Sequence, residues 1–272
     1  MKIAVTGASG FIGRHVLTEL IKHEANIVAV TRDAKRLSDW SGSVRVVEMD
    51  IANPAPDNFE CLGKPDVLIH LAWDGLPNYK SLHHFETELP RQYQFLKSMV
   101  ESGLPSLIVT GTCFEYGMQS GVLSPTMPTK PTNPYGYAKD ALRQQMEYLR
   151  AIKPFKLTWG RLFYMYGEGQ PATSLYPKLR EAVLRGDQVF NMSGGEQLRD
   201  YLRVEEVAQQ IVRLAMAQGD AGAVNICSGK PISVRRLVEN WLAENNWKIE
   251  LNLGHYPYPD YEPMAFWGEL KY

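Results

Sequence analysis

Short runs of apolar residues alternate with longer stretches in which apolar residues recur every three or four positions through the first two thirds of the chain. Most of the runs are continuously apolar, which is typical of parallel strands covered on both faces. The runs predict strands at residues 2–6, 27–31, 44–49, 66–72, 106–111 and 155–162, and the periodic stretches predict helices at residues 11–24, 91–103 and 136–152. This strand–helix–strand order predicts an α/β fold with helices on both faces of a sheet.

The pattern changes after about residue 165, where Gly, Pro and Tyr become frequent. Helices are predicted near residues 174–186, 204–218 and 233–245, with a late strand in 223–229 and an extended tail over the surface in 255–272. We therefore expect a Rossmann-type doubly wound parallel sheet in residues 1–165, rejoined by a segment around 199–229, and a smaller substrate-binding lobe in residues 166–272.

The composition is that of an ordinary globular protein, with 44% hydrophobic and 22% charged residues. The formal net charge of -1 gives no field that would hold nucleic acid or an anionic membrane, and no apolar run is long enough to span a bilayer. Cys61, Cys113 and Cys227 are far apart and show no metal-ligand spacing. Since the chain begins directly with strand-like residues, we expect a cytoplasmic protein with reduced cysteines and no metal, nucleic-acid or membrane partner.

Three glycines, Gly7, Gly10 and Gly13, stand where the first strand ends and the first helix begins. The first permits a tight turn, the second lets a pyrophosphate approach the main chain, and the third lets the helix pack closely on the strand. The helix N-terminus then offers unpaired N–H groups to phosphates. A plain turn explains one glycine but not three at this spacing, so the segment predicts a dinucleotide site. Its expected contacts are Gly7, Ser9, Gly10, Phe11, Ile12 and Gly13.

The end of the second strand predicts which dinucleotide binds. A carboxylate there holds the ribose 2′-hydroxyl of NAD, whereas an arginine accepts the 2′-phosphate of NADP. Arg32 stands at this position, Asp33 follows it and Arg36 lies one turn later, so NADP is predicted, with NAD as the alternative. Solvated loop charges are the competing interpretation of both arginines. Asp50, at the end of the third strand, is placed to meet the adenine.

Tyr135 and Lys139 are four residues apart and therefore share one face of a helix. A phenol with a pKa of about 10 is a poor acid or base at neutral pH, and a nearby ammonium favours the phenolate. Most Tyr and Lys residues at this spacing are simply exposed on a helix surface, which is the competing interpretation. The position of the pair after the fifth strand of a nucleotide-binding sheet favours catalysis instead.

Four stretches together resemble the extended short-chain dehydrogenase/reductase family of nucleotide-sugar epimerases, dehydratases and reductases. They are TGASGFIG (6–13), TGTCFEYG (110–117), PYGYAK (134–139) and RDYLRVEEVA (199–208), in the family's order. The resemblance implies that Tyr135 exchanges a proton with a sugar oxygen, that Lys139 binds the nicotinamide ribose and lowers the pKa of Tyr135, and that Thr112 orients the substrate oxygen. It also implies that Phe163 lies beside the nicotinamide and that Arg199 grips the diphosphate of a nucleotide sugar.

The carboxyl ends of the other strands complete the expected sites, because ligands bind there in open α/β sheets. Further cofactor contacts are expected from Ile51, Leu71, Ala72, Trp73 and Thr110, and substrate contacts from Trp73, Thr112, Cys113, Phe114, Tyr164, Lys178, Asn191 and Arg199. Lys178 belongs to a basic run with Arg180 and Arg185, for which a solvated helix face is the competing interpretation. Asn191 is expected near the nucleotide base, and a solvated surface is expected for His83 and His84.

Positions where this chain differs from the family's motifs argue against some of the activities that the family shows. Its 4,6-dehydratases carry Asp-Glu directly after the catalytic Thr, where this chain has Cys113 and Phe114, so a dehydratase is disfavoured. The cysteine of 3,5-epimerising relatives would stand at Phe114, one residue from Cys113, which disfavours that activity too. The family's Asn-Val pair near Leu89-Pro90 is absent, and Tyr164 replaces a common Asn.

The sequence thus predicts an NADPH-dependent reductase of a nucleotide-linked 4-keto-6-deoxy hexose, in deoxysugar or polysaccharide biosynthesis, with Tyr135 protonating the oxygen at C4. The alternatives are an NAD-dependent nucleotide-sugar 4-epimerase, which Arg32 argues against, and a non-enzymatic dinucleotide sensor, which the intact Tyr, Lys and Thr argue against. The family often dimerises through helices equivalent to 91–103 and 136–152, so a homodimer is expected. Its face could include Leu142, Met146 and Leu149, or these residues could pack on their own sheet.

Overall fold

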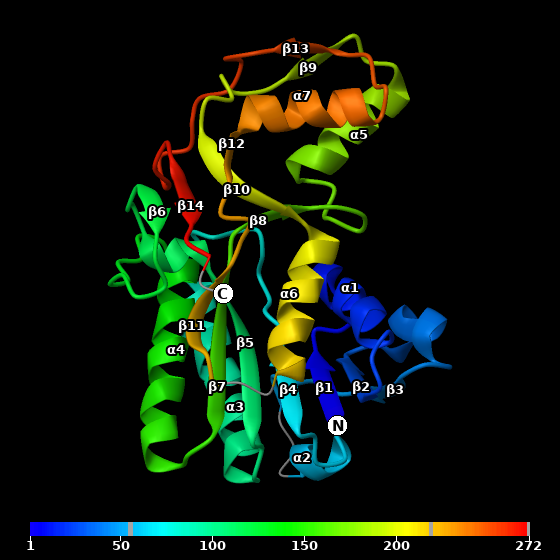
Figure 1. The fold of residues 1–272 in the computed structure, drawn as a ribbon, viewed down its shortest axis with the longest axis vertical. Coiled ribbons are helices and arrows are strands. Elements are labelled where there is room, and N and C mark those ends of the chain that lie inside the picture. Colours follow the sequence, from blue (N-terminus) through cyan, green and yellow to red (C-terminus); the bar gives the residue numbers. More distant parts are fainter. Residues whose placement is uncertain (54–56, 218–219, 271–272) are drawn as a thin grey trace.

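Seven strands form one parallel sheet in the order β11–β7–β5–β4–β1–β2–β3 (Figure 1). They are β1 (Lys2–Thr6), β2 (Asn26–Thr31), β3 (Arg45–Glu48), β4 (Val67–His70), β5 (Ser106–Thr112), β7 (Lys156–Leu162) and β11 (Gly222–Ile226). This computed structural model describes residues 1–53, 57–217 and 220–270. The strand order runs outward from β1 in both directions, so the predicted doubly wound α/β fold is confirmed.

Helices cover both faces of this sheet. α1 (Phe11–Leu20) and α6 (Val204–Met216) pack together over one face, and α3 (Leu89–Glu101) and α4 (Pro134–Ile152) pack together over the other, while the short α2 (Asn58–Cys61) precedes β4. The side chains of β1 divide between the two cores. Ile3 and Val5 lie in the first core and Ala4 in the second, as the two-residue period of a strand requires.

The predicted elements are present, with shifts at their ends. β3 and β4 are shorter than predicted, β5 continues to Thr112, and α1 ends at Leu20. β11 pairs in parallel with β7, so the predicted return of the chain to the main sheet is confirmed. Residue 218 of the predicted helix 204–218 lies outside the described residues.

A second, smaller core follows β7. β8 (Tyr164–Tyr166), β10 (Leu198–Arg203) and β12 (Pro231–Ser233) form a three-stranded sheet, and β9 (Val189–Asn191) pairs with β13 (Glu250–Asn252). α5 (Leu175–Arg185) and α7 (Val234–Glu244) pack with these strands around Phe190 and Trp241. Figure 1 shows this part of the molecule above the carboxyl ends of the main-sheet strands.

The C-terminal tail is more than a surface layer. β14 (Phe266–Gly268) pairs in parallel with β6 (Gly121–Leu123), and Phe266 is only 3% exposed. Phe266 packs in a cluster with Tyr116, Phe163 and Cys227. The expectation of a tail that merely covers the surface is therefore wrong for this segment, because its apolar side chain fills an internal cluster. Residues 271–272, also part of the predicted tail, lie outside the described residues.

The two sides of α4 differ in burial. Leu142, Met146 and Leu149 are buried in the core beneath the helix, so they pack on their own sheet and form no dimer face. Exposed apolar side chains of α4 include Tyr137 near its start, and Tyr148 and Ile152 near its end, the last two at 73% and 85%. In the described part of the chain, no helix combines the length and apolar character that crossing a membrane requires.

Candidate active site

The turn after β1 brings glycines against two stretches of main chain. Gly7 has a φ of +69°, and a Cβ there would lie 2.8 Å from the Ala72 nitrogen. A Cβ on Gly13 would collide with the Gly7 carbonyl oxygen and lie 2.7 Å from the Ala8 Cα, so α1 packs directly on the turn. Gly10 is the N-cap residue of α1, and no described side chain accepts a hydrogen bond from the first N–H groups of the helix. The first turn of α1 carries no acidic residue. The N–H groups of this helix end are thus placed to meet an anion.

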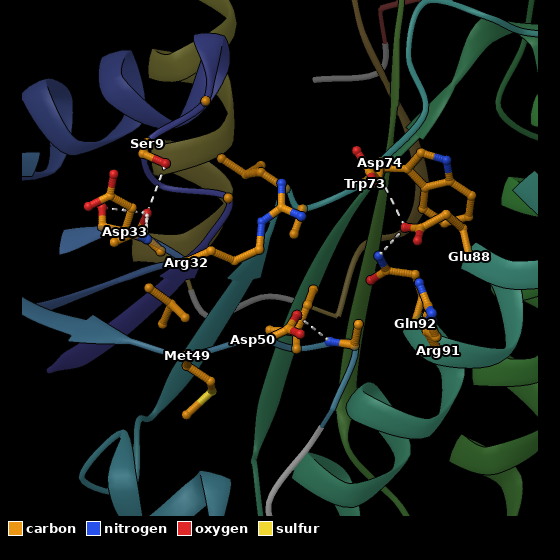
Figure 2. Close-up of a pocket in the computed structure, with 18 of the residues that line it drawn as sticks. Ser9, Arg32, Asp33, Met49, Asp50, Trp73, Asp74, Glu88, Arg91 and Gln92 are labelled. Carbon is orange, nitrogen blue, oxygen red and sulfur yellow. Dashed lines mark hydrogen bonds between the residues drawn. The ribbon is translucent and has the colours of Figure 1, made fainter. Parts of the chain in front are cut away.

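A cavity lies beside this turn, at the carboxyl ends of the central strands (Figure 2). It is lined by ten residues that the sequence predicts as cofactor contacts: Gly7, Ser9, Gly10, Arg32, Arg36, Asp50, Ile51, Leu71, Ala72 and Trp73. Sequence reasoning missed Glu88, Arg91 and Gln92, which also line it. These three come from the start of α3 and the turn before it, and no local pattern reveals that this segment lies across the strand ends.

The end of β2 presents guanidinium groups to this cavity. Figure 2 shows Arg32 extended into the cavity and Asp33 beside Ser9. Asp33 Oδ1 accepts a hydrogen bond from the Lys35 N–H at 3.0 Å, so this carboxylate starts the following 3₁₀ turn. Arg36 Nη2 donates to the Ser9 carbonyl at 3.4 Å. The arrangement offers positive charge where a ribose 2′-substituent is expected.

Tyr135 and Lys139 lie in the first turns of α4. The helix begins where Asn133 Oδ1 accepts the Gly136 N–H at 2.8 Å, with Pro134 in its first turn. Burial lowers the pKa of Lys139 to about 7, although nearby carboxylates oppose the shift. Its Nζ donates to the Thr110 carbonyl at 2.9 Å and lies 4.0 Å from the centre of the Trp73 ring.

Aromatic side chains enclose the phenol of Tyr135. The nearest ring centroids are those of His84 at 5.2 Å, Tyr79 at 5.6 Å, Trp73 at 6.0 Å and Phe114 at 6.4 Å. Burial is the largest cause that raises the pKa of Tyr135 well above its usual range, and a hydrogen bond with Thr112 opposes the rise. Lys139 is not among the groups that shift the pKa of Tyr135, so its expected lowering of this pKa stays a prediction.

His84 is not solvated as expected. It is fully buried, and its Nδ1 accepts a hydrogen bond from Trp73 Nε1 at 3.1 Å while its Nε2 donates to the Asn78 carbonyl at 2.9 Å. Burial also lowers the pKa of His84, which favours this neutral form. The imidazole thus fixes the segment that folds back over Tyr135.

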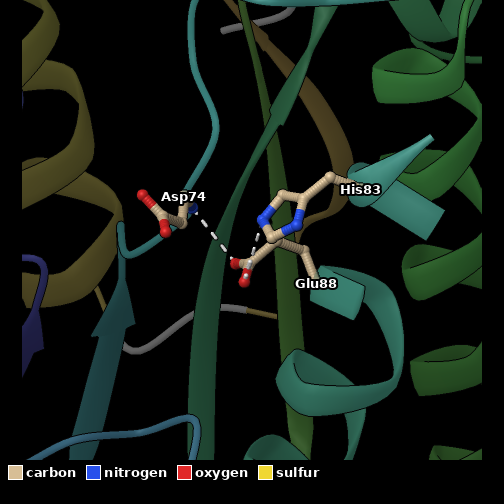
Figure 3. A group of neighbouring side chains, drawn as sticks. All are labelled: Asp74, His83 and Glu88. Carbon is tan, nitrogen blue, oxygen red and sulfur yellow. Dashed lines mark hydrogen bonds and ion pairs between the residues drawn. The ribbon is translucent and has the colours of Figure 1, made fainter. Parts of the chain in front are cut away.

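His83 lies near two carboxylates, Asp74 and Glu88 (Figure 3). The possible ligand atoms of the three residues lie within 4.8 Å of one another, a spacing that a metal ion could use. Glu88 already accepts hydrogen bonds from the Asp74 N–H at 3.1 Å and from Gln92 Nε2 at 2.9 Å, and His83 Nε2 is 3.7 Å from its other oxygen. Glu88 therefore binds the other two residues, through the backbone N–H of Asp74 and the ring of His83, and also binds Gln92.

A second, larger cavity of about 970 Å³ lies between the tail and the small core. Four residues predicted to bind substrate line it: Tyr164, Lys178, Asn191 and Arg199. The other predicted substrate contacts, Trp73, Thr112, Cys113 and Phe114, lie around Tyr135. The two groups meet where the Phe114 ring packs 6.2 Å from that of Tyr261, which also lines the second cavity.

Arg199 is buried at the wall of this second cavity, with 2% of its surface exposed. Its Nη2 lies 3.0 Å from Glu262 Oε1, and Nη2 has no acceptor in hydrogen-bond geometry among the described residues. Glu262 also accepts a hydrogen bond from the Tyr164 hydroxyl. Sequence reasoning missed Glu262, because only the tertiary pairing of the tail brings this carboxylate to the site.

The remaining predicted cofactor residues lie outside the first cavity. Phe11 packs edge-on to His15, and Ile12 packs against the core below α1. Thr110 reaches the site through its carbonyl, which holds Lys139. Phe163 is buried between Tyr116 and Phe266.

Comparison with known proteins places these features in a family. The model of the family "NAD dependent epimerase/dehydratase family" matches residues 3–227. The dTDP-6-deoxy-L-talose 4-dehydrogenase (NAD(+)) of Aggregatibacter actinomycetemcomitans is 33% identical over 270 residues, 98% of this chain and 99% of the relative. The dTDP-6-deoxy-L-talose 4-dehydrogenase (NAD(P)(+)) of Kitasatospora kifunensis is 24% identical over 283 residues, 99% of this chain and 86% of the relative.

A solved structure has the same fold. MoeE5 in complex with UDP-glucuronic acid and NAD superposes with a TM-score of 0.81 and 27% identity, covering 100% of this chain and 90% of that one. The expected similarity to extended short-chain dehydrogenases/reductases is confirmed.

Proposed function

The chain belongs to the NAD-dependent epimerase/dehydratase family and is an NAD(P)-dependent oxidoreductase, and we propose that it reduces the C4 carbonyl of a dTDP-linked 4-keto-6-deoxy hexose with NADPH. The relatives named for dTDP-6-deoxy-L-talose support this substrate, because oxidation of that sugar at C4 and reduction of the 4-keto sugar are one reaction in two directions.

One observation carries the proposal: the buried Tyr135 and Lys139 share one face of α4, and the Lys139 Nζ is fixed by the Thr110 carbonyl at the end of β5. Such a phenol donates a proton when a carbonyl is reduced and accepts one when the alcohol is oxidised, so the absent dehydratase acids and Arg32 are what favour the reductase. Cys113 and Phe114, where a dehydratase carries acid and base, supply neither. Burial raises the pKa of Cys113 far above neutrality, so its thiol stays protonated.

The residues around the first cavity fit a dinucleotide. The Gly7 turn leaves no space for a side chain, and the first turn of α1 presents N–H groups to a diphosphate. Arg32 and Arg36 would hold a 2′-phosphate, and Lys139 would hold the nicotinamide ribose. When bound, this coenzyme supplies the hydride that reduces the sugar carbonyl.

Residues of the chain then bind the C4 oxygen and supply its proton. Thr112 and Tyr135 donate hydrogen bonds to it, which positions the carbonyl and stabilises the negative charge that develops there. The Tyr135 hydroxyl gives its proton to that oxygen, so the product is a neutral alcohol and a phenolate that recovers a proton from water. The aromatic side chains around Tyr135 keep bulk water away from this transfer.

The second cavity would hold the rest of the substrate. Arg199 and Lys178 line it and would bind the diphosphate, and Asn191 would face the base. We propose that the small lobe, residues 166–272, is the substrate-binding part of the chain.

The test is NADPH oxidation, followed by absorbance, with the 4-keto form of dTDP-6-deoxy-L-talose. We expect turnover by the wild type and a loss of about 10² to 10⁴ in kcat for Tyr135→Phe, with unchanged NADPH binding. Interconversion of C4 epimers without NADPH consumption, by protein that retains NAD, would establish the 4-epimerase instead.

A further inference from the structure

The proposed reaction uses the hydroxyls of Thr112 and Tyr135 but not the buried carboxylate of Glu115, which binds the Thr112 N–H. Glu115, in the 3₁₀ turn Cys113–Tyr116, has no exposed surface. Its Oε1 accepts hydrogen bonds from the Thr112 N–H and from Trp159 Nε1, each at 2.9 Å. Its Oε2 accepts one from Arg161 Nε at 2.6 Å. Both oxygens are thus engaged by fixed donors.

Arg161 is itself held in place. It is 2% exposed, and its Nη1 donates to the Tyr116 hydroxyl at 3.1 Å and to the Pro125 carbonyl at 3.0 Å. A planar guanidinium with three fixed acceptors leaves the Glu115 carboxylate little freedom to turn. Strand β7, which carries Trp159 and Arg161, therefore determines the orientation of Glu115.

Thr112 receives its orientation from this carboxylate. Its N–H donates to Glu115, and its Oγ1 accepts the Phe114 N–H at 3.3 Å, which together form a capping box. The turn that begins at Thr112 packs against Tyr135, whose ring centroid lies 6.4 Å from that of Phe114. The main chain at Gly111 packs closely against the Trp159 ring, because a Cβ on Gly111 would lie only 2.8 Å from Trp159 Cδ1.

A buried ion pair often stabilises a fold no more than an apolar pair of the same size, because both charges are withdrawn from water. An apolar pair would fill this space but would not accept the Thr112 N–H. We infer that Glu115 is a positioning residue of the proposed reductase, on which this inference rests: it holds Thr112 and the turn that begins there beside Tyr135, without contacting substrate or cofactor.

The test is a double-mutant cycle between Glu115→Gln and Thr112→Ala, measured as kcat for NADPH-dependent reduction. A glutamine side chain has one acceptor oxygen and one NH2 group. It therefore cannot accept from Arg161 Nε on one side and from Thr112 N–H and Trp159 Nε1 on the other, so the side chain must move. We expect kcat to fall about 10- to 100-fold, with both KM values within about twofold. In the Thr112→Ala background the same change should lower kcat less than about twofold, because the positioned hydroxyl is already absent. Equal losses in both backgrounds would overturn the inference.

Two further variants separate positioning from stability. Glu115→Leu/Arg161→Met replaces both charges with apolar side chains, and we expect its Tm to return toward the wild-type value while kcat stays low. Recovery of kcat together with Tm would mean that Glu115 serves only the fold. The control Asp140→Asn breaks a partly buried ion pair, with Arg143 at 2.7 Å, and should lower Tm with kcat unchanged.

A measurement without substrate distinguishes failure of this inference from failure of the proposed function. The ¹³Cζ NMR signal of Tyr135, assigned through its loss in Tyr135→Phe, should shift in Glu115→Gln and in Thr112→Ala. If the wild type reduces no 4-keto sugar but the shift is seen, the proposed function fails and the positioning stands. If the signal does not move in Glu115→Gln, the positioning is overturned.

Discussion

Lys139 and Tyr135 sit side by side on α4 and are both withdrawn from water. Burial lowers the pKa of Lys139 to about 7 and raises that of Tyr135 above its usual range. At neutral pH the phenol therefore keeps its proton, while the ammonium is close to losing one. A group that titrates so near neutrality responds strongly to a ligand that binds beside it.

NADH affinity should depend on pH through Lys139. Below pH 7 the ammonium is present and can donate to the ribose, and as pH rises through 7 the free protein loses that proton, so binding must take one up. We expect the Kd for NADH to rise by up to about tenfold between pH 6 and pH 8, measured by fluorescence titration. Lys139→Met should bind more weakly with no such dependence. A wild-type Kd that is constant over this range would contradict the assignment.

Arg32 should determine the preference for the 2′-phosphate. Arg32→Asp removes a charge-assisted hydrogen bond and adds repulsion, so the NADPH/NADH ratio of kcat/KM should fall about 10- to 100-fold. Lys35→Asp is the matched control, because it makes the same charge change three residues later in the chain, at a residue that does not line the cavity. An unchanged ratio in Arg32→Asp would remove the argument for NADP.

Individual contacts were the least predictable from the sequence. The burial of His84 depends on a loop that folds back over Tyr135, and the pairing of Arg199 with Glu262 joins residues far apart in the chain. No local pattern encodes either contact. Glu115 did have a local signal, because Thr112 and Glu115 have the spacing of a capping box.

At the scale of elements, the contact between α1 and the turn after β1 leaves no room for a side chain at Gly13. Gly13→Ala would place a Cβ against the Gly7 carbonyl and Ala8, pushing the helix off the turn. We expect a loss of about 1–3 kcal/mol in the free energy of unfolding, measured in urea, and weaker NADH binding. Gly42→Ala is the control, since a Cβ there meets nothing within 4 Å, and it should change neither. Equal effects of the two variants would show that close packing at Gly13 is not required.

The main-sheet elements were predictable because their apolar runs and helical periods are long and local. The tail was not, since its prolines and aromatics have no regular period and β14 finds its partner β6 over 140 residues earlier in the chain. Short strands such as β8 and β12 likewise depend on β10 for their pairing.

For the molecule as a whole, we predict a homodimer formed through α3 and α4. Tyr148 and Ile152 are exposed and one turn apart on α4, so they share a face that a second copy could cover. Light scattering after size exclusion should give a dimer for the wild type and a monomer for Tyr148→Glu/Ile152→Glu. Leu184→Glu, at an exposed apolar site on α5, should remain a dimer. A wild-type monomer would contradict the prediction.

Tyr135 packs against Trp73, which lines the first cavity, and against Phe114, which in turn packs against Tyr261 of the second cavity. The central claim is that a hydride reaches C4 of the sugar between these cavities while Tyr135 supplies the proton. The most direct measurement uses NADPH with deuterium at both C4 positions of the nicotinamide, and the 4-keto form of dTDP-6-deoxy-L-talose. We predict a 4-hydroxy product with one deuterium at sugar C4, formed as NADPH is consumed, and little product with Tyr135→Phe. A product without deuterium, or no product, would contradict the account.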